Sequence, residues 1–127
     1  MHEWSLACEL VRQAEQEASS RGAVKVLSLT ARVGLLTGVV PELLIRSYEM
    51  ARMETLLEDA ALLVESQPVR ARCPSCGATS TFQEFGLVCP VCGALGLEVL
   101  EGEEIVLTRM ELEIPDSPVS EKGERHV

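Results

Sequence analysis

The sequence predicts an α+β fold in which two helices pack on a small mixed sheet of three strands. Three observations indicate this class. Apolar side chains recur at three- and four-residue steps in two segments, they alternate with polar ones in three others, and a cysteine-rich segment interrupts the series. The 127 residues, 46% hydrophobic and 24% charged, suit one ordinary domain with a small appendage.

The first helix is expected between Ser5 and Arg21. Ser5 can cap its start, and Gly22 can supply the left-handed residue that ends it. Cys8 is interpreted as a small buried hydrophobic residue in preference to a reactive thiol, because it falls on the apolar stripe. That stripe consists of Ala7, Cys8, Val11, Ala14 and Ala18.

The next two elements are a strand and a second helix. Between Ala23 and Val33 the period is two, which indicates a half-buried strand with Leu27, Leu29, Ala31 and Val33 on its inner face. Pro41 is suited to the first turn of a helix, which we expect to reach about Leu57. Leu44, Tyr48 and Ala51 mark the inner face of this second helix.

Two later segments complete the sheet. Ala60 to Glu65 has strand character, and so has Glu104 to Glu113, where Val106, Met110 and Leu112 alternate with more polar residues. Residues 1–69 and 101–113 therefore form one unit, which we call the helix–sheet body. Residues 114–127, with two prolines and mixed charges, are expected to be a disordered tail.

Residues 70–100, which we call the cysteine module, contain two copies of one device. Cys73 and Cys76 flank Pro-Ser, Cys89 and Cys92 flank Pro-Val, and a glycine follows each pair. A Cys-x-x-Cys turn lets two thiolates hold one ion, and two such turns complete a tetrahedral zinc site. The segment is too short for a core of its own, so we expect a zinc-ribbon-like module inserted before the last strand.

A redox function is the competing interpretation of these cysteines. It would require a single Cys-x-x-Cys that opens a helix, and neither condition is met. Four protein ligands leave no open position, so the zinc is expected to be structural. Nucleic acid is disfavoured as a partner, because the net charge is −9 and Glu84 is the sole charged residue between Cys73 and Cys92.

The first residues are a candidate site for a second metal. The α-amine of Met1, the peptide nitrogen between residues 1 and 2, and the imidazole of His2 can form fused chelate rings around one ion. Three nitrogens in a plane suit square-planar Ni(II) or Cu(II). The short lead into the helix at Ser5 would hold these donors near an ordered element.

Taken together, these features resemble the HypA/HybF family of hydrogenase maturation proteins. The likeness rests on the opening Met1-His2-Glu3-x-Ser5-Leu6, on the order of helices and strands, and on the paired knuckles before the final strand, and it covers residues 1–113. It implies a nickel metallochaperone for [NiFe]-hydrogenase, and in some organisms urease. The implied nickel residues are Met1, His2 and Glu3, with Glu3 supporting the site, and Cys73, Cys76, Cys89 and Cys92 hold zinc.

The resemblance also implies partners, namely a HypB-type GTPase and the hydrogenase large subunit. The sequence departs from some relatives because no histidine lies between Cys73 and Cys92. Trp4, directly after the nickel motif, is expected to pack on the sheet, although it could shield the metal. No function is assigned to His126.

The remaining expectations concern class and location. No nucleophile is paired with a base and no phosphate loop is present, so we expect no enzyme activity. The apolar runs are too short for a membrane span and no leader pattern opens the chain, which predicts a cytoplasmic protein. A monomer or weak homodimer is expected. The alternative to nickel delivery is a zinc-ribbon protein-interaction module without a nickel role.

Overall fold

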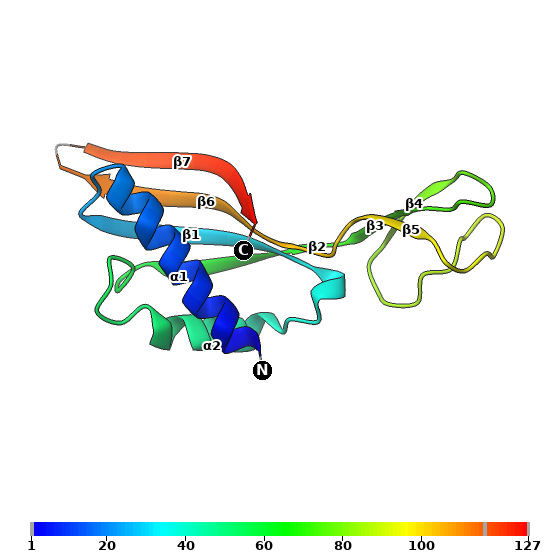
Figure 1. Cartoon of the computed structure of the whole chain (residues 1–127), viewed down its shortest axis with the longest axis horizontal. Helices are drawn as coiled ribbons and strands as arrows, with labels where there is room; N and C mark the ends of the chain where they lie inside the picture. The colour runs from blue at the N-terminus through cyan, green and yellow to red at the C-terminus, as the bar shows by residue number, and fades with distance from the viewer. Residues whose placement is uncertain (1, 116, 127) are drawn as a thin grey trace.

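The computed structural model describes residues 2–115 and 117–126, with side chains described for residues 3–115. The predicted α+β class and the predicted order of elements are confirmed (Figure 1). In chain order the elements are α1 (His2–Ser20), β1 (Lys25–Gly34), the 3-10 helix η1 (Leu35–Thr37), α2 (Pro41–Ala51), β2 (Ala61–Gln67), β3 (Val69–Arg72), β4 (Thr79–Phe82), β5 (Glu98–Glu101), β6 (Ile105–Ile114) and β7 (Ser117–His126).

Two separate sheets organise the chain. The larger is mixed and has the strand order β2-β1-β6-β7, in which β1 pairs parallel with β2 and antiparallel with β6. The smaller has the order β4-β3-β5 and lies in the cysteine module, which extends from one end of the helix–sheet body (Figure 1). The large sheet is thus mixed as predicted, but it has four strands where three were expected.

The fourth strand is β7, which comes from the expected disordered tail. It pairs antiparallel with β6, from Ile114 opposite Ser117 to Val106 opposite His126. Composition predicted disorder because Pro115, Pro118 and mixed charges give the segment little to bury. The structure differs because β6 offers an open edge whose backbone groups can pair with a further strand.

Both helices cover one face of the large sheet, and the core lies between these layers (Figure 1). Leu10, Leu29, Leu44, Tyr48 and Leu112 are among its fully buried side chains. On α1 the predicted inner positions Ala7, Val11, Ala14 and Ala18 are all buried. The amphipathic pattern therefore placed α1 on the sheet correctly.

Three expectations for α1 were wrong in detail. The helix begins at His2 and not at Ser5, so the N-terminal motif belongs to its first turn. Cys8 is exposed, and Leu10 takes a core position in its place. Because each residue turns the helix by about 100°, Cys8 falls well to one side of the stripe through Ala7, Val11 and Ala14. Trp4, one turn before Cys8 on the same side, is 48% exposed and does not belong to the buried core between helices and sheet.

The second helix is shorter than predicted. It ends at Ala51, and turns that include Glu54 at φ 62° carry the chain to Ala60. Leu57 is still fully buried, although it lies in these turns. Apolar spacing alone cannot distinguish a helical residue from a buried turn residue, which explains the overestimate.

Two irregularities interrupt the predicted alternation in the strands. The register of β1 against β6 shifts between Val26 and Ser28, so that Val26 is buried while Leu27, the predicted inner residue, is only partly buried. A second shift, at Thr108 in β6, puts both Leu107 and Met110 in the core. Bulges of this kind add one residue to one strand and reverse the side-chain alternation beyond it.

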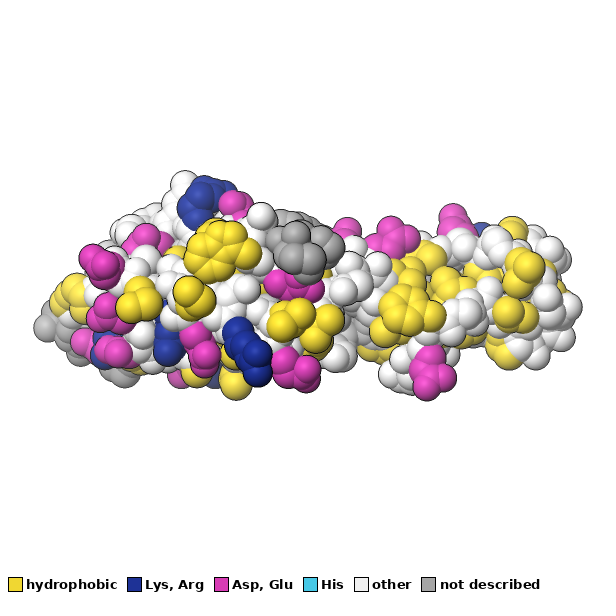
Figure 2. Space-filling view, turned by 90° about the horizontal axis from the view of Figure 1, so that it is seen from below, with side chains coloured by type: hydrophobic (Ala, Val, Ile, Leu, Met, Phe, Trp, Pro, Cys, Tyr) yellow, Lys and Arg dark blue, Asp and Glu magenta, His cyan; other side chains and the backbone are white. Residues whose placement is uncertain are grey.

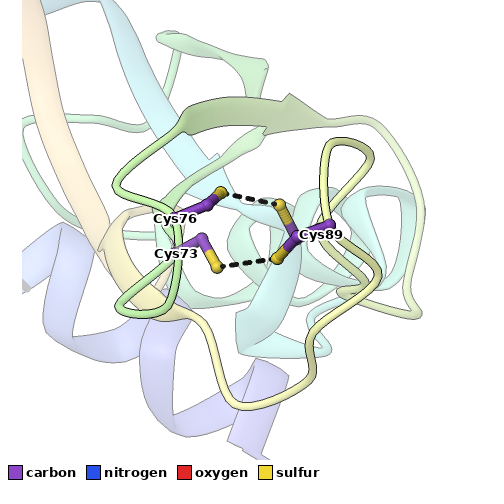
Figure 3. Close-up of side chains that lie close together, drawn as sticks. Cys73, Cys76 and Cys89 are labelled. Atoms are coloured by element: carbon purple, nitrogen blue, oxygen red, sulfur yellow. Dashed lines mark hydrogen bonds between the residues drawn. The ribbon is translucent and has the colours of Figure 1, made fainter.

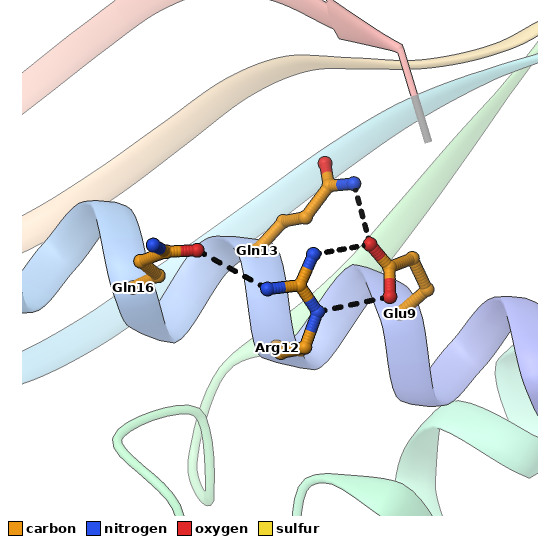
Figure 4. A network of polar contacts seen from close by, with 4 residues as sticks. All are labelled: Glu9, Arg12, Gln13 and Gln16. Atoms are coloured by element: carbon orange, nitrogen blue, oxygen red, sulfur yellow. Dashed lines mark hydrogen bonds and ion pairs between the residues drawn. The ribbon is translucent and has the colours of Figure 1, made fainter.

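The outer surface of α1 carries a network of polar side chains (Figure 4). Glu9 accepts hydrogen bonds from Arg12 and from Gln13 (2.8 Å), and Arg12 also donates to Gln16 (3.2 Å). The hydrogen bond from Arg12, followed by that from Gln13, lowers the pKa of Glu9 to about 2.

Within the described residues, no helix has the length and apolar character that a membrane span requires.

Candidate metal centre

The cysteine module brings together its four predicted ligands. Their sulfurs all lie within 4.8 Å of one another. The Sγ atoms of Cys73 and Cys92 are 3.6 Å apart, and so are those of Cys76 and Cys89 (Figure 3). Four sulfurs at ~2.3 Å from a central zinc would be separated by roughly 3.8 Å, so the observed spacing fits a tetrathiolate zinc site.

Each pair of cysteines is held by the same backbone turn. In the first, Gly77 N–H donates to Cys73 O (2.8 Å) and Cys73 N–H donates to Ala78 O (2.8 Å). The second repeats this pattern at Gly93, Cys89 and Ala94, with distances of 2.8 and 3.0 Å. Gly77 and Gly93 have φ of 78° and 77°, a left-handed conformation that explains the glycine after each pair.

The two turns also divide the cysteines by exposure. Cys73 and Cys89, the first residues of each pair, are buried, whereas Cys76 and Cys92 are exposed. Each turn therefore contributes one inner and one outer sulfur. The equivalence of the two turns supports a shared ion at their centre, because neither turn alone supplies more than two ligands.

Backbone donors favour the thiolate form of the inner cysteines. The N–H of Cys76, followed by that of Ser75, lowers the pKa of Cys73. The N–H groups of Cys92 and Val91 act in the same way on Cys89, and its pKa falls to about 6. These donors were not foreseen from the sequence, although the Cys-x-x-Cys turn is the signal that produces them.

The outer cysteines behave in the opposite way. The N–H of Ala78 lowers the pKa of Cys76, but desolvation and the nearby Cys89 and Cys73 sulfurs outweigh it, and the net pKa is raised. For Cys92 the N–H of Ala94 is likewise outweighed, chiefly by Cys73 and desolvation, which raise its pKa to about 12. Four close thiolates repel one another, so zinc must supply the positive charge that allows all four to ionise.

The predicted nickel residues are described only in part. Met1 and the side chain of His2 lie outside the described residues, and the backbone of His2 begins α1. Glu3 is 5% exposed, and its Oε2 accepts a hydrogen bond from the N–H of Val40 at 3.4 Å. The carboxylate thus joins the first turn of α1 to the start of α2. The separation of 37 residues left no sequence signal for this contact.

Comparison with known proteins places these features in a family. The model of the family described as hydrogenase/urease nickel incorporation, metallochaperone, HypA matches residues 1–112. The hydrogenase maturation factor HypA of Nitrosospira multiformis is 40% identical over 112 residues, which cover 88% of this chain and 97% of that protein. HypA of Geobacter metallireducens is 38% identical over 113 residues, with 89% and 100% of the two chains covered.

A solved structure shares the fold. The solution structure of the nickel metallochaperone HypA from Helicobacter pylori aligns with a TM-score of 0.66 and 25% sequence identity, over 90% of this chain and 99% of that one. The chain therefore belongs to the HypA family of hydrogenase and urease nickel-incorporation metallochaperones.

Proposed function

We propose that this chain, a nickel metallochaperone of hydrogenase maturation, binds one Ni(II) at its N-terminus and delivers it to the hydrogenase large subunit. The observation that carries the proposal is the family match over residues 1–112, which includes the N-terminal motif and the paired knuckles. The nickel donors are the α-amine of Met1, the peptide nitrogen of His2 and the His2 imidazole. Urease is a second recipient class within the same family description.

Glu3 supports this site from a buried position, because its side chain is not open to solvent. Its side chain is 5% exposed and lies against the N–H of Val40, the residue that caps α2. A carboxylate in this place stabilises two helix N-termini, because both carry unsatisfied N–H groups and partial positive charge. Glu3 thereby fixes the helix turn from which the nickel donors extend.

The zinc site has a structural role in this proposal. Cys73, Cys76, Cys89 and Cys92 form a complete tetrahedral set and leave no position for a substrate. We assign residues 70–100 to a module that zinc stabilises, and residues 1–69 and 101–113 to the body that carries nickel. The β7 strand extends that body beyond the boundary drawn from the sequence.

The chain acts by binding and transfer and not by catalysis. A HypB-type GTPase is its expected partner in the cytoplasm, and the chain is a monomer or weak homodimer. The net charge of −9 supports protein partners over nucleic acid. The cysteine module adds a surface on which apolar side chains gather, with Phe85, Val91 and Leu95 each more than 60% exposed (Figure 2).

The test is calorimetric titration of Ni(II) into untagged protein. His2→Ala should abolish stoichiometric nickel binding and leave one zinc per chain, and His126→Ala is the matched control.

An added N-terminal residue should have the same effect as His2→Ala, since it converts the α-amine into a peptide link. Binding should weaken as pH falls from about 8 to 6, because protons compete for the α-amine and the imidazole.

Undiminished nickel affinity in His2→Ala would refute the N-terminal site. If neither the parent protein nor the variants bound nickel, a zinc-ribbon interaction module without a nickel role would be the correct interpretation. A flat pH profile would exclude the amine as a ligand.

A further inference from the structure

The segment between β1 and α2 contacts the exit from the cysteine module at one end and Glu3 at the other. It comprises Gly34, the last residue of β1, followed by η1 (Leu35–Thr37), Gly38, Val39 and Val40, and we call it the strap. In Figure 1 it turns at the end of β1 nearest the cysteine module and returns towards the first turn of α1.

At its first end the strap lies in close backbone contact with the β5–β6 connection. Leu36 N–H donates to Gly102 O and Gly34 N–H donates to Glu104 O, both at 2.9 Å. A Cβ added to Gly34 would lie 2.3 Å from Gly102 O, and one added to Gly102 would lie 2.9 Å from the Cα of Val69. Three backbone segments therefore meet where the two sheets join, with no room for a side chain.

In the middle of the strap, Thr37 fixes the turn. Its Oγ1 donates to Gly34 O (2.7 Å) and accepts from Val39 N–H (3.2 Å). The next residue, Gly38, has φ 73°, so the chain reverses sharply there. The hydroxyl of Thr37 thus links the anchored end of the strap to the residue before Val40.

At its second end the strap meets the nickel terminus. Val40 N–H donates to Oε2 of Glu3 at 3.4 Å, and Glu3 directly follows His2. Continuous contacts therefore lead from Gly102 through Leu36, Thr37 and Val39 to the residue beside the nickel donors. A strap that moved would displace the buried carboxylate it contacts.

We propose that the strap positions the nickel-binding N-terminus and that Thr37 is its central positioning residue. The strap holds Glu3, and Glu3 holds the first turn of α1 in the orientation that lets the amine, peptide nitrogen and imidazole converge. The hydrogen bond from Leu36 N–H to Gly102 O also connects this terminus with the chain that leaves the cysteine module. The inference rests on the proposed N-terminal nickel site.

The chain supplies a matched control at the other end of α2. Thr55 Oγ1 donates to Arg52 O (2.6 Å) and accepts from Leu57 N–H (3.1 Å), which is the same pattern as at Thr37. The adjacent Leu56 N–H donates to Oε2 of Glu15 (3.0 Å), as Val40 does to Glu3. Glu15 lies roughly 18 Å along α1 from Glu3, so this copy of the arrangement is remote from the nickel donors.

The experiment compares Thr37→Val and Thr55→Val by nickel titration, the visible spectrum of bound Ni(II), zinc content and thermal unfolding. Both variants should lose a similar increment of melting temperature and retain zinc. Thr37→Val alone should weaken nickel binding, by about fivefold or more because two hydrogen bonds of the hydroxyl are lost, and shift the Ni(II) absorption bands. Thr37→Ser, which keeps the hydroxyl, should restore both properties.

Gly34→Ala should weaken nickel binding more than Thr37→Val, because a methyl group cannot occupy the space beside Gly102 O. If Gly34→Ala does not fold, the threonine pair still decides the question. Equal nickel affinity and equal spectra in Thr37→Val and Thr55→Val would overturn the inference. Nickel binding that survives His2→Ala would instead refute the proposed site, a separately identifiable failure.

Discussion

The helix–sheet body has a continuous apolar core, whereas the cysteine module has almost none. In the body, α1 and α2 bury Leu10, Leu44 and Tyr48 completely against the sheet. Between residues 70 and 100, all of which the structure describes, only Ala71, Cys73 and Cys89 are buried, and two of these are proposed metal ligands. The difference teaches that burial can fold the body, while the module depends on its ion.

The sharpest way to break this comparison is to remove the metal site. Cys89→Ser, or extraction of zinc by a chelator, should reduce zinc from one per chain to none and eliminate β3, β4 and β5, since the module has no core to replace it. The body should remain folded. Backbone amide NMR signals of the two sheets, together with elemental analysis, measure both outcomes.

Cys8→Ser is the control for that experiment, because Cys8 is an exposed thiol on α1 outside the cluster. It should retain zinc and every NMR signal of the module. A module that stayed folded in zinc-free protein would contradict the structural assignment.

The complementary change removes core volume from the body. Leu44→Ala should lower the free energy of unfolding of the body by about 3 kcal/mol, because Leu44 is fully buried and the cavity cannot fill completely. Zinc content should not change. Urea unfolding followed by far-UV circular dichroism gives the energy, and Leu43→Ala, at an exposed position on the same helix, is the matched control.

A smaller effect is expected for the one buried tyrosine. Tyr48 donates from its hydroxyl to Ala60 O (2.8 Å), and Arg52 donates to the same oxygen (2.8 Å). Tyr48→Phe should therefore cost only about 1 kcal/mol, since Ala60 O keeps a partner.

Tyr48 should also make the free energy of unfolding of the body depend on pH in the alkaline range. Burial raises its pKa to about 12, above the ordinary tyrosine value of 10.0. The unfolded state loses this proton first, so the stabilisation present below pH 10 should decline as pH rises from about 10 to 12. Urea unfolding across this range should show less decline in Tyr48→Phe, and identical profiles would contradict the assignment.

The smallest effect concerns the surface of α1. The pKa of Glu9, lowered from 4.5 to about 2 by Arg12 and Gln13, should return towards its ordinary value in Arg12→Ala. A lowered pKa adds stability above pH 4.5 that is lost as pH falls towards 2, but exposure and salt keep this contribution small. Side-chain carboxyl NMR titration measures it, and Gln16→Ala, which leaves the Glu9 contacts intact, should titrate like the parent.

Much of this architecture followed from sequence patterns alone. The order of helices and strands came from periodicity, and the four clustered cysteines came from count, spacing and flanking glycines. These features are local, so a short stretch of sequence contains the whole physical cause. Cys8 shows the limit of that reasoning, because one position on a helix stripe separates a core residue from an exposed one.

Tertiary structure decided the features that depend on distant segments. The tail became β7 because β6 presented an open edge, and the alternation in β1 changed because its register against β6 shifts after Val26. Glu3 meets Val40, and Gly34 meets Gly102, across separations that no local pattern encodes. The sequence by itself therefore determined the two helices, the strands β1, β2 and β6, and the two cysteine pairs that cluster in the fold. Only the packing of backbone against backbone decided how the cysteine module, the strap and the first turn of α1 are joined. Close approach and hydrogen bonding between remote segments exist only in the folded chain.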